Sequence, residues 1–242
     1  ARLAGESRLM SLIITPQLIV PPFKRPVANT FSKAQTGVAA SSSGTTVSVS
    51  LASNPQPGHV VCVGLGFYDG GASATTVSVS DGNGNSYTIE GHGSGSTNVA
   101  AVGQAFLAYL ANTPANADKT ITATFGRSSV VVAIWVDDFA PSSGVPTYDN
   151  GAFASGTGAI TTPIIPVSGP NELLYALALD ANDAQPAQSP WTNNEGGATG
   201  SGIGNTGWFA SWILSASANT AVKYPGTSGN AYNAVGMSFK IV

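Results

Sequence analysis

The stretch DGNGN at residues 81–85 carries the oxygen-bearing side chains that a calcium site would need. Asp81, Asn83 and Asn85 match the first three ligand positions of an EF-hand loop. The match ends there, because the loop lacks the glycine at position 6 and the glutamate at position 12. Asp-Gly and Asn-Gly between alternating β-formers are also a strong hairpin signal. The sequence therefore favours a turn, with a calcium site at Asp81, Asn83 and Asn85 as the alternative.

Other motifs give little support for cofactor binding or nucleophilic catalysis. Residues 202–207, GIGNTG, have the GxGxxG spacing, but a strand rather than a helix is expected after them. The chain has no GxSxG elbow, His59 begins an expected strand, and a pairing of His92 with Ser94 would lack a visible orienting carboxylate to complete a triad. The two histidines also lack zinc-ligand spacing. We therefore predict no cofactor, no zinc site and no catalytic triad.

Paired carboxylates could hydrolyse a glycosidic bond if two of them faced one cleft. Asp137 and Asp138 are adjacent on a strand, so they are expected to point to opposite faces. Glu90, Glu172 and Glu195 have no partner that the sequence identifies. We interpret these groups as solvated strand ends. A sandwich glycanase that depends on Glu90, Asp138 or Glu172 is the alternative.

Two aromatic residues are candidates for contact with a sugar. Trp191 lies in the polar segment QSPWTNNE, and Tyr148 lies in PTYDNG. Either ring could stack on a glycan, and Trp191 could equally fill a gap beneath its own loop. Trp135, Trp208 and Trp212 lie within expected strands and are assigned to the core.

From about residue 45 onward, short apolar segments alternate with turns rich in Gly, Ser, Asn and Pro. Alternation with period two is typical of half-buried strands. The run 130–136 is apolar on both faces, which predicts a central strand covered on both sides, or a strand with one face covered by a partner chain. Residues 100–111 are expected to form a strand, with a helix as the alternative. We predict an all-β fold, a two-sheet antiparallel β-sandwich or jelly roll over residues 36–242. The expected strands lie near residues 47–51, 61–67, 77–79, 87–89, 101–109, 121–125, 130–136, 173–179, 208–214, 221–224 and 235–241.

Residues 1–35 differ from the rest of the chain. Four prolines between residues 16 and 26 exclude a regular helix or sheet interior, yet the segment is strongly apolar. We predict an extended N-terminal arm that binds a partner, or an edge strand packed on the same domain. The arm residues expected to contact a partner are Arg2, Arg8, Leu9, Leu12, Ile13, Ile14, Leu18, Ile19, Phe23, Lys24 and Arg25.

Charge separates the two parts as well. Only 9% of all residues are charged, and the net charge is −3. Residues 1–35 carry five basic residues and one acidic residue, whereas the remainder carries four basic and eleven acidic residues. Five basic residues over 35 positions are too sparse for a nucleic-acid-binding arm. A single cysteine, Cys62, excludes an internal disulfide, and no apolar run is long enough to span a membrane.

Three segments of the body carry a resemblance to a known family. They are the hairpin at residues 77–88, the strand KTITATF at 119–125, and the strand 130–136 with the following Asp137-Asp-Phe139. Together they resemble concanavalin-like jelly-roll domains, which occur in secreted bacterial proteins and in virion proteins of tailed bacteriophages. The opening ARLAGESRL is similar to the first residues of some phage head and tail appendage proteins. Neither resemblance supplies a catalytic residue.

These observations lead to one hypothesis and two alternatives. The first is a non-enzymatic structural protein of a phage virion, with a decoration, cement or fibre role. Its partners would be other capsid or tail proteins, and it would form a homo-oligomer such as a trimer. The second is a carbohydrate-binding, lectin-like module that is secreted or binds a receptor, with Trp191 and Tyr148 as glycan contacts. The glycanase is the third.

Overall fold

The computed structural model describes residues 29–71, 74–91, 103–157, 160–180, 189–193, 208–224 and 231–242. Every element in these ranges is a β-strand and every strand pairing is antiparallel, which confirms the all-β prediction. The first eight strands are β1 (Phe31–Ser41), β2 (Gly44–Ser50), β3 (Val60–Tyr68), β4 (Val77–Asp81), β5 (Thr88–Ile89), β6 (Gln104–Leu110), β7 (Thr120–Ser129) and β8 (Val131–Pro141). The others are β9 (Pro146–Thr157), β10 (Ile160–Ile165), β11 (Glu172–Asp180), β12 (Thr192–Asn193), β13 (Trp208–Ala216), β14 (Thr220–Tyr224) and β15 (Ala231–Ile241).

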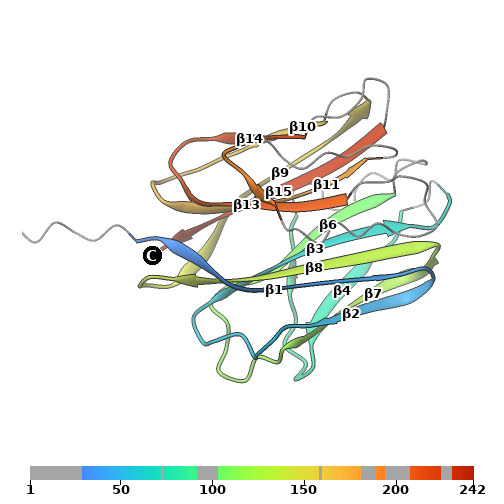
Figure 1. Ribbon diagram of the computed structural model, residues 1–242, viewed down its shortest axis with the longest axis horizontal. Helices are drawn as coiled ribbons and strands as arrows, with labels where there is room; N and C mark the ends of the chain where they lie inside the picture. The colour runs from blue at the N-terminus through green and yellow to red at the C-terminus, as the bar shows by residue number, and fades with distance from the viewer. Residues whose placement is uncertain are drawn as a thin grey trace, which may run out of the picture.

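The strands form four sheets, where the sequence predicted two. The first half of the chain contributes a first inner sheet, β1-β8-β3-β6-β5, and a first outer sheet, β2-β7-β4. The second half contributes a second inner sheet, β12-β13-β11-β15-β9, and a second outer sheet, β10-β14. Figure 1 shows the four sheets stacked as layers, with the two inner sheets in the middle.

Three apolar cores separate the four layers. One lies between the first outer and first inner sheets, the largest lies between the two inner sheets, and a smaller one lies between the second inner and second outer sheets. The inner strands are therefore covered on both faces. In β3, Val61 and Val63 face the first of these cores, whereas Val60 and Cys62 face the largest. The central position predicted for residues 130–136 is confirmed, because β8 lies between β1 and β3.

The two halves of the chain repeat one topology. The order β1-β8-β3-β6-β5 in the first inner sheet corresponds strand by strand to β9-β15-β11-β13-β12 in the second. Each inner sheet thus pairs the first strand of its half with the last, and the last with the third strand of that half. The pair β2-β7 of the first outer sheet likewise corresponds to β10-β14. Only β4 lacks a counterpart among the residues that the structure describes.

The pairing registers repeat in detail. In β1 the register shifts directly after Lys33, which pairs with Phe139. In β9 it shifts directly after Tyr148, which pairs with Phe239. A bulge is a specific local feature, so its presence at the same place in both halves supports an internal duplication.

The short edge strands fix further equivalences between the halves. Thr88, the first residue of β5, pairs with Tyr109, and Thr192, the first residue of β12, pairs with Trp212. Tyr109 and Trp212 therefore occupy equivalent positions. The residues that precede the two edge strands, Tyr87 and Trp191, are equivalent as well.

The body begins before residue 35. β1 starts at Phe31, and residues 31–35 of the predicted arm pair with β8. The expected strand near residues 101–109 is confirmed from Gln104, where β6 starts. The sequence analysis did not identify β1, β9, β10 and β12 as strands, although each lies in an inner or outer sheet.

Candidate functional site

Asp81 organises the turn that follows β4. Its Oδ1 accepts hydrogen bonds from the backbone N–H groups of Asn83 (3.0 Å) and Asn85 (2.9 Å). Its Oδ2 accepts from Asn85 Nδ2 (2.8 Å) and from the backbone N–H of Asp118 (2.9 Å). Burial opposes ionisation of this carboxyl, but the four donors outweigh it and lower its pKa.

Both oxygens of Asp81 are thus directed at N–H donors, the arrangement of a hydrogen-bonded turn. This geometry favours the turn over the calcium alternative. Among the described residues, no group of three or more His, Cys, Asp and Glu side chains is placed to hold a metal ion.

Four carboxylates that we interpreted as solvated strand ends are buried. Asp137 and Glu172 are 0% exposed, Asp138 is 1% exposed and Glu90 is 2% exposed. The sequence interpretation was wrong because these side chains are directed at polar groups of other strands and turns rather than at solvent. Each carboxylate has its own hydrogen-bond partners.

The first buried cluster joins the two inner sheets through Asp137. Its Oδ2 accepts a 2.9 Å hydrogen bond from the hydroxyl of Tyr175 on β11. Lys33 Nζ lies 3.9 Å from its Oδ1 and 4.1 Å from the ring centroid of Trp212. Phe139 packs edge-on against Trp212, with centroids 6.0 Å apart. One ammonium group therefore lies near both a buried carboxylate, whose charge it partly offsets, and an aromatic face, with which it makes a cation–π contact.

The second cluster occupies the equivalent place on the other half. The rings of Tyr148 and Tyr109 stack with centroids 4.9 Å apart and planes 3° apart, and Phe239 packs edge-on against Tyr109 at 5.3 Å. The hydroxyl of Tyr148 donates a 3.0 Å hydrogen bond to Glu90 Oε1. Burial, followed by the charge of Glu90, raises the pKa of Tyr148. Tyr148 is half-buried in strand β9, not in a loop, and one face of its ring is covered by Tyr109.

Asp138 lies on the opposite face of β8 from Asp137, as expected. Its Oδ1 is 2.8 Å from His59 Nδ1, and its Oδ2 accepts a 3.0 Å hydrogen bond from Gln35 Nε2. Gln35 also accepts a hydrogen bond from the backbone N–H of Ser53. His59 thus fixes a strand end, and its acidic partner is buried and fully engaged.

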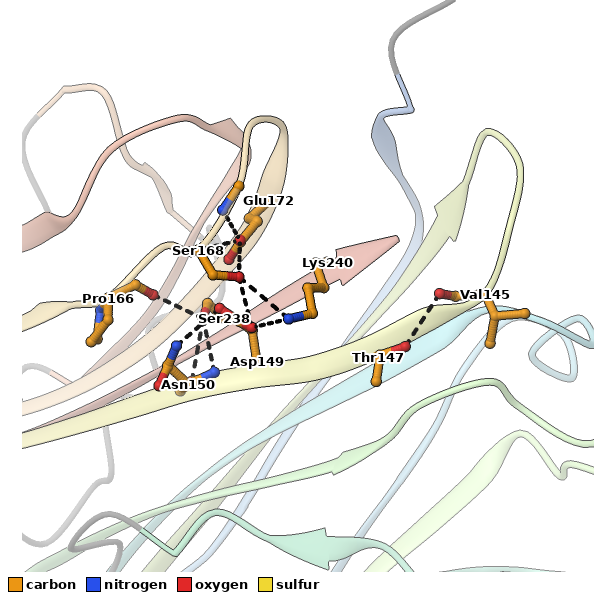
Figure 2. A network of polar contacts seen from close by, with 10 residues as sticks. Val145, Thr147, Asp149, Asn150, Pro166, Ser168, Glu172, Ser238 and Lys240 are labelled. Carbon is orange, nitrogen blue, oxygen red and sulfur yellow. Dashed lines mark hydrogen bonds and ion pairs between the residues drawn. The ribbon is translucent and has the colours of Figure 1, made fainter. Parts of the chain in front are cut away.

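Figure 2 shows the polar network of the second half. Lys240 Nζ lies 2.6 Å from Asp149 Oδ1 and 3.4 Å from the hydroxyl of Ser168. The Ser168 hydroxyl also donates to Asp149, and Glu172 Oε1 accepts from the backbone N–H groups of Ser168 and Gly169.

A serine beside a lysine is an arrangement used in nucleophilic catalysis, where the lysine must be neutral to accept a proton. Here the hydrogen bond that Lys240 donates to Asp149, together with the negative charge of Asp149, raises the pKa of Lys240. This contact stabilises the charged form of the lysine, which argues against a role as the base for Ser168. The network instead ties the start of β11 to β9 and β15.

Trp191 lies in the core between the second inner and second outer sheets. It is 6% exposed, and its indole N–H donates a 3.3 Å hydrogen bond to the carbonyl of Ala221. Its equivalent in the first half, Tyr87, is also 6% exposed and lies in the matching core. This position corresponds to the alternative in which Trp191 fills a gap beneath its loop.

The outward side of the first outer sheet carries a feature that the sequence analysis did not identify. Eight hydroxyl side chains lie on it in register, and we name them the hydroxyl face. They are Thr46, Ser48 and Ser50 of β2, Thr120, Thr122 and Thr124 of β7, and Ser78 and Ser80 of β4. The alternation of these residues with buried apolar ones, as in TVSVS and TITAT, is the signal that could have identified it.

Several candidates lie outside the described residues. They are the arm residues of positions 1–28, His92, Glu195 and the GIGNTG segment. The arm therefore stays a prediction.

Comparisons of the chain with protein-family models, curated proteins and solved structures find no match. Within the part of the chain that the structure describes, no helix is long and apolar enough to cross a membrane.

Proposed function

We propose that this chain is a non-enzymatic structural protein of a bacteriophage particle, with a decoration, cement or fibre role. Its jelly-roll-type β-body would be anchored to the capsid or tail by the N-terminal arm. The observation that carries the proposal is the place at which the chain enters the body. Thr30 and Ser142 exchange two hydrogen bonds, of 2.8 and 3.0 Å, at the end of the stack where β1 begins.

The C-terminus lies at this same end. Val145 and Val242 exchange two backbone hydrogen bonds of 3.0 Å close to Ser142, and both side chains are exposed. Figure 1 shows the start of β1 beside the C-terminal end, with the four layers extending away from them. A body whose chain enters and leaves at one end can be attached there and project outward.

The interior supports a structural role rather than catalysis. Asp137, Asp138, Glu90 and Glu172 bind residues from other strands or from the turn before their own strand. In these positions they stabilise the junctions between strands and layers. The low charge of the whole chain is also compatible with a protein that works within an assembly rather than as a free monomer.

The test compares the full chain with a variant that lacks residues 1–28. Both are mixed with particles of the phage whose genome encodes the chain, after deletion of its gene from that phage. We expect the full chain to sediment with the particles and the truncated chain to stay in solution with an unchanged unfolding temperature. Light scattering of the full chain measures the proposed homo-oligomer, a trimer being the expected form.

Two results would contradict the proposal. The first is the absence of the protein from gradient-purified wild-type particles in mass spectrometry. The second is unfolding of the truncated chain, which would mean that residues 1–28 belong to the core of the same body.

A further inference from the structure

We propose that the two halves of the body are separate folding units, and that the inner face of each half can bind the complementary half of a second copy of the chain. The first half contains β1 to β8 and the second contains β9 to β15. The inner faces are the sides of the two inner sheets that border the largest core. This inference goes beyond the anchoring role and does not depend on residues 1–28, because the surfaces concerned lie in the body.

Each half has the parts of a complete two-layer domain. In the first half, a core made of its own residues lies between the outer and inner sheets, and the second half has the corresponding core. Two packed layers around one core are the usual architecture of a folded domain. Among the described residues, every strand pairing, and every backbone hydrogen bond outside the strands, joins residues of one half. The halves are therefore not joined by a shared sheet.

The largest core is shared by the two halves. Its members include Trp135 and Phe139 of the first half and Tyr175, Leu177 and Phe239 of the second, all 0% exposed. Separation of the halves would expose these side chains together, and a contiguous apolar surface of this kind marks an interaction site. Each half thus has an inner face that must be covered, and the other half fits it.

The contacts across the largest core are reciprocal. Phe139 of the first half packs edge-on against Trp212 of the second, with centroids 6.0 Å apart. Phe239 of the second half packs edge-on against Tyr109 of the first at 5.3 Å. The two phenylalanines are equivalent in the registers of the halves, and so are Trp212 and Tyr109. This is the pattern of an isologous dimer interface, which forms between separate chains.

One hydrogen bond favours the pairing of unlike halves. The Tyr175 hydroxyl of the second half donates a 2.9 Å hydrogen bond to the buried Asp137 of the first half. The registers make Cys62 the first-half equivalent of Tyr175. Two first halves packed in the same way would therefore set each Asp137 against a thiol, which is a weak donor. Because a buried carboxylate needs strong donors, the inner face selects the complementary half.

The connection between the halves is short and exposed. Residues 142–145 join β8 to β9, and all of them are exposed. Ser142 bonds to Thr30 of the first half, whereas Val145 bonds to Val242 of the second. The halves therefore divide within this turn. In the uncut chain the turn keeps the complementary half nearby, so binding within one chain is favoured over exchange between copies.

The test inserts a protease recognition sequence between Ser143 and Gly144 of the full chain and cuts the protein after it has folded. Cut protein carrying a heavy-isotope label is mixed with unlabelled cut protein in buffer without denaturant, and native mass spectrometry follows the pairs of halves. We expect hybrid pairs, with one labelled and one unlabelled half, to accumulate until they equal the parent pairs. Uncut chains mixed in the same way are the control for exchange of whole subunits.

Two tryptophans provide a matched pair of variants. Trp212 lies in the largest core between the halves and Trp191 in the core within the second half, with 3% and 6% exposure. Trp212→Ala should speed the formation of hybrid pairs at least about tenfold, because it weakens the contact that must open. Trp191→Ala should leave that rate unchanged, because the side chain it removes lies within one half.

A second interface variant covers the case in which Trp212→Ala does not fold. Tyr175→Phe keeps the ring and removes the hydroxyl that donates to Asp137, so it should speed the formation of hybrid pairs about tenfold. Circular dichroism establishes that each variant is folded before it is cut.

Each of four results would overturn the inference. The halves could unfold once the chain is cut, or hybrid pairs could form only after unfolding in urea. Trp191→Ala could speed exchange as much as Trp212→Ala does, which would mean that exchange requires a half to unfold. Pairs of two first halves could form as readily as hybrid pairs, which would show that the inner face does not select the complementary half.

Discussion

The two aromatic clusters between the inner sheets are equivalent in position and different in chemistry. In one, Lys33 of the first half lies over Trp212 of the second half. In the other, Tyr148 of the second half stacks on Tyr109 of the first half. The contacts are reciprocal, as in the isologous interface of a symmetric dimer. The repeat thus preserves the backbone register and the packing role of each position, while the side chain that fills the position differs between the halves.

A second comparison concerns the bulge in each inner sheet. In the first half, Gln35 beyond the bulge of β1 donates to the carboxylate of Asp138. In the second half, the backbone N–H of Asn150, in the bulge of β9, donates a 3.1 Å hydrogen bond to the hydroxyl of Ser238. Both pairs join the first strand of a half to its last strand. One uses a buried charge and the other a neutral hydroxyl.

The largest expected effect comes from removing the two aromatic residues at equivalent positions of the clusters, Trp212 and Tyr109. Trp212 is 3% exposed, so Trp212→Ala should lower the free energy of unfolding by about 4 kcal/mol. Tyr109→Ala should cost about 2 kcal/mol, because its ring is only partly buried. Urea denaturation measures both. Equal losses would show that the two clusters do not differ in packing as the structure indicates.

The next effect compares the two bulges. Asp138→Ala should lower the free energy of unfolding by about 3 kcal/mol, because it leaves His59 and Gln35 without their shared carboxylate. Ser238→Ala removes neutral hydrogen bonds and should cost about 1 kcal/mol. The reverse order, measured in the same denaturant series, would disprove the assigned roles.

Acid should weaken one turn of the first half. The pKa of Asp81 is lowered in the folded state from an ordinary value of 3.8, so its stabilising effect is complete above that value. It is lost as the pH falls through the lower, folded-state pKa. At pH 7 the free energy of unfolding of Asp81→Asn should be about 1–2 kcal/mol below that of the wild type. This difference should disappear in strong acid.

A second carboxylate, Asp149 in the second half, should show the same dependence on pH. Burial opposes ionisation of Asp149, but hydrogen bonds from Lys240, Ser168 and Asn150 lower its pKa. Asp149→Asn should therefore also lose its difference from the wild type in acid. A gap that stays constant from pH 7 to pH 2 for Asp81→Asn would mean that the charge of its carboxylate does not stabilise the turn.

The smallest expected effect concerns the residues that cover the two aromatic rings. Lys33→Met should cost about 0.5–1 kcal/mol, because Lys33 is partly exposed and its charge is screened. This loss should shrink at high salt. Tyr148→Phe keeps the stacked ring and removes only the hydrogen bond to Glu90, so its cost should not vary with salt. A salt-independent loss for Lys33→Met would assign its role to packing alone.

The local pattern of apolar and polar residues was sufficient to predict much of the secondary structure. Alternating residues such as Val47 and Val49 predicted β2, and the uninterrupted apolar run at residues 130–136 predicted a central strand. These predictions hold because side-chain direction alternates along any strand, whatever covers it. β9 and β10 were not identified, because β9 is mostly half-buried and β10 contains a proline.

The duplication was not visible in the sequence, because equivalent positions hold unlike residues. Lys33 corresponds to Tyr148, Tyr109 to Trp212 and Tyr87 to Trp191. What these pairs share is a place in a hydrogen-bonded register, and register appears only when the strands are paired. The same limit made Trp191 a candidate for glycan contact, although its equivalent position is that of a core aromatic residue.

By itself, the sequence determined that the body is all-β and that the Asp81 segment forms a turn, because both follow from contacts between near neighbours in the chain. Only the tertiary structure decided that Asp137, Asp138, Glu90 and Glu172 are buried, and that eight hydroxyls share one face. Burial of Asp137, Asp138 and Glu90 depends on partners supplied by residues distant in the chain. Such residues leave no local pattern at the position they cover.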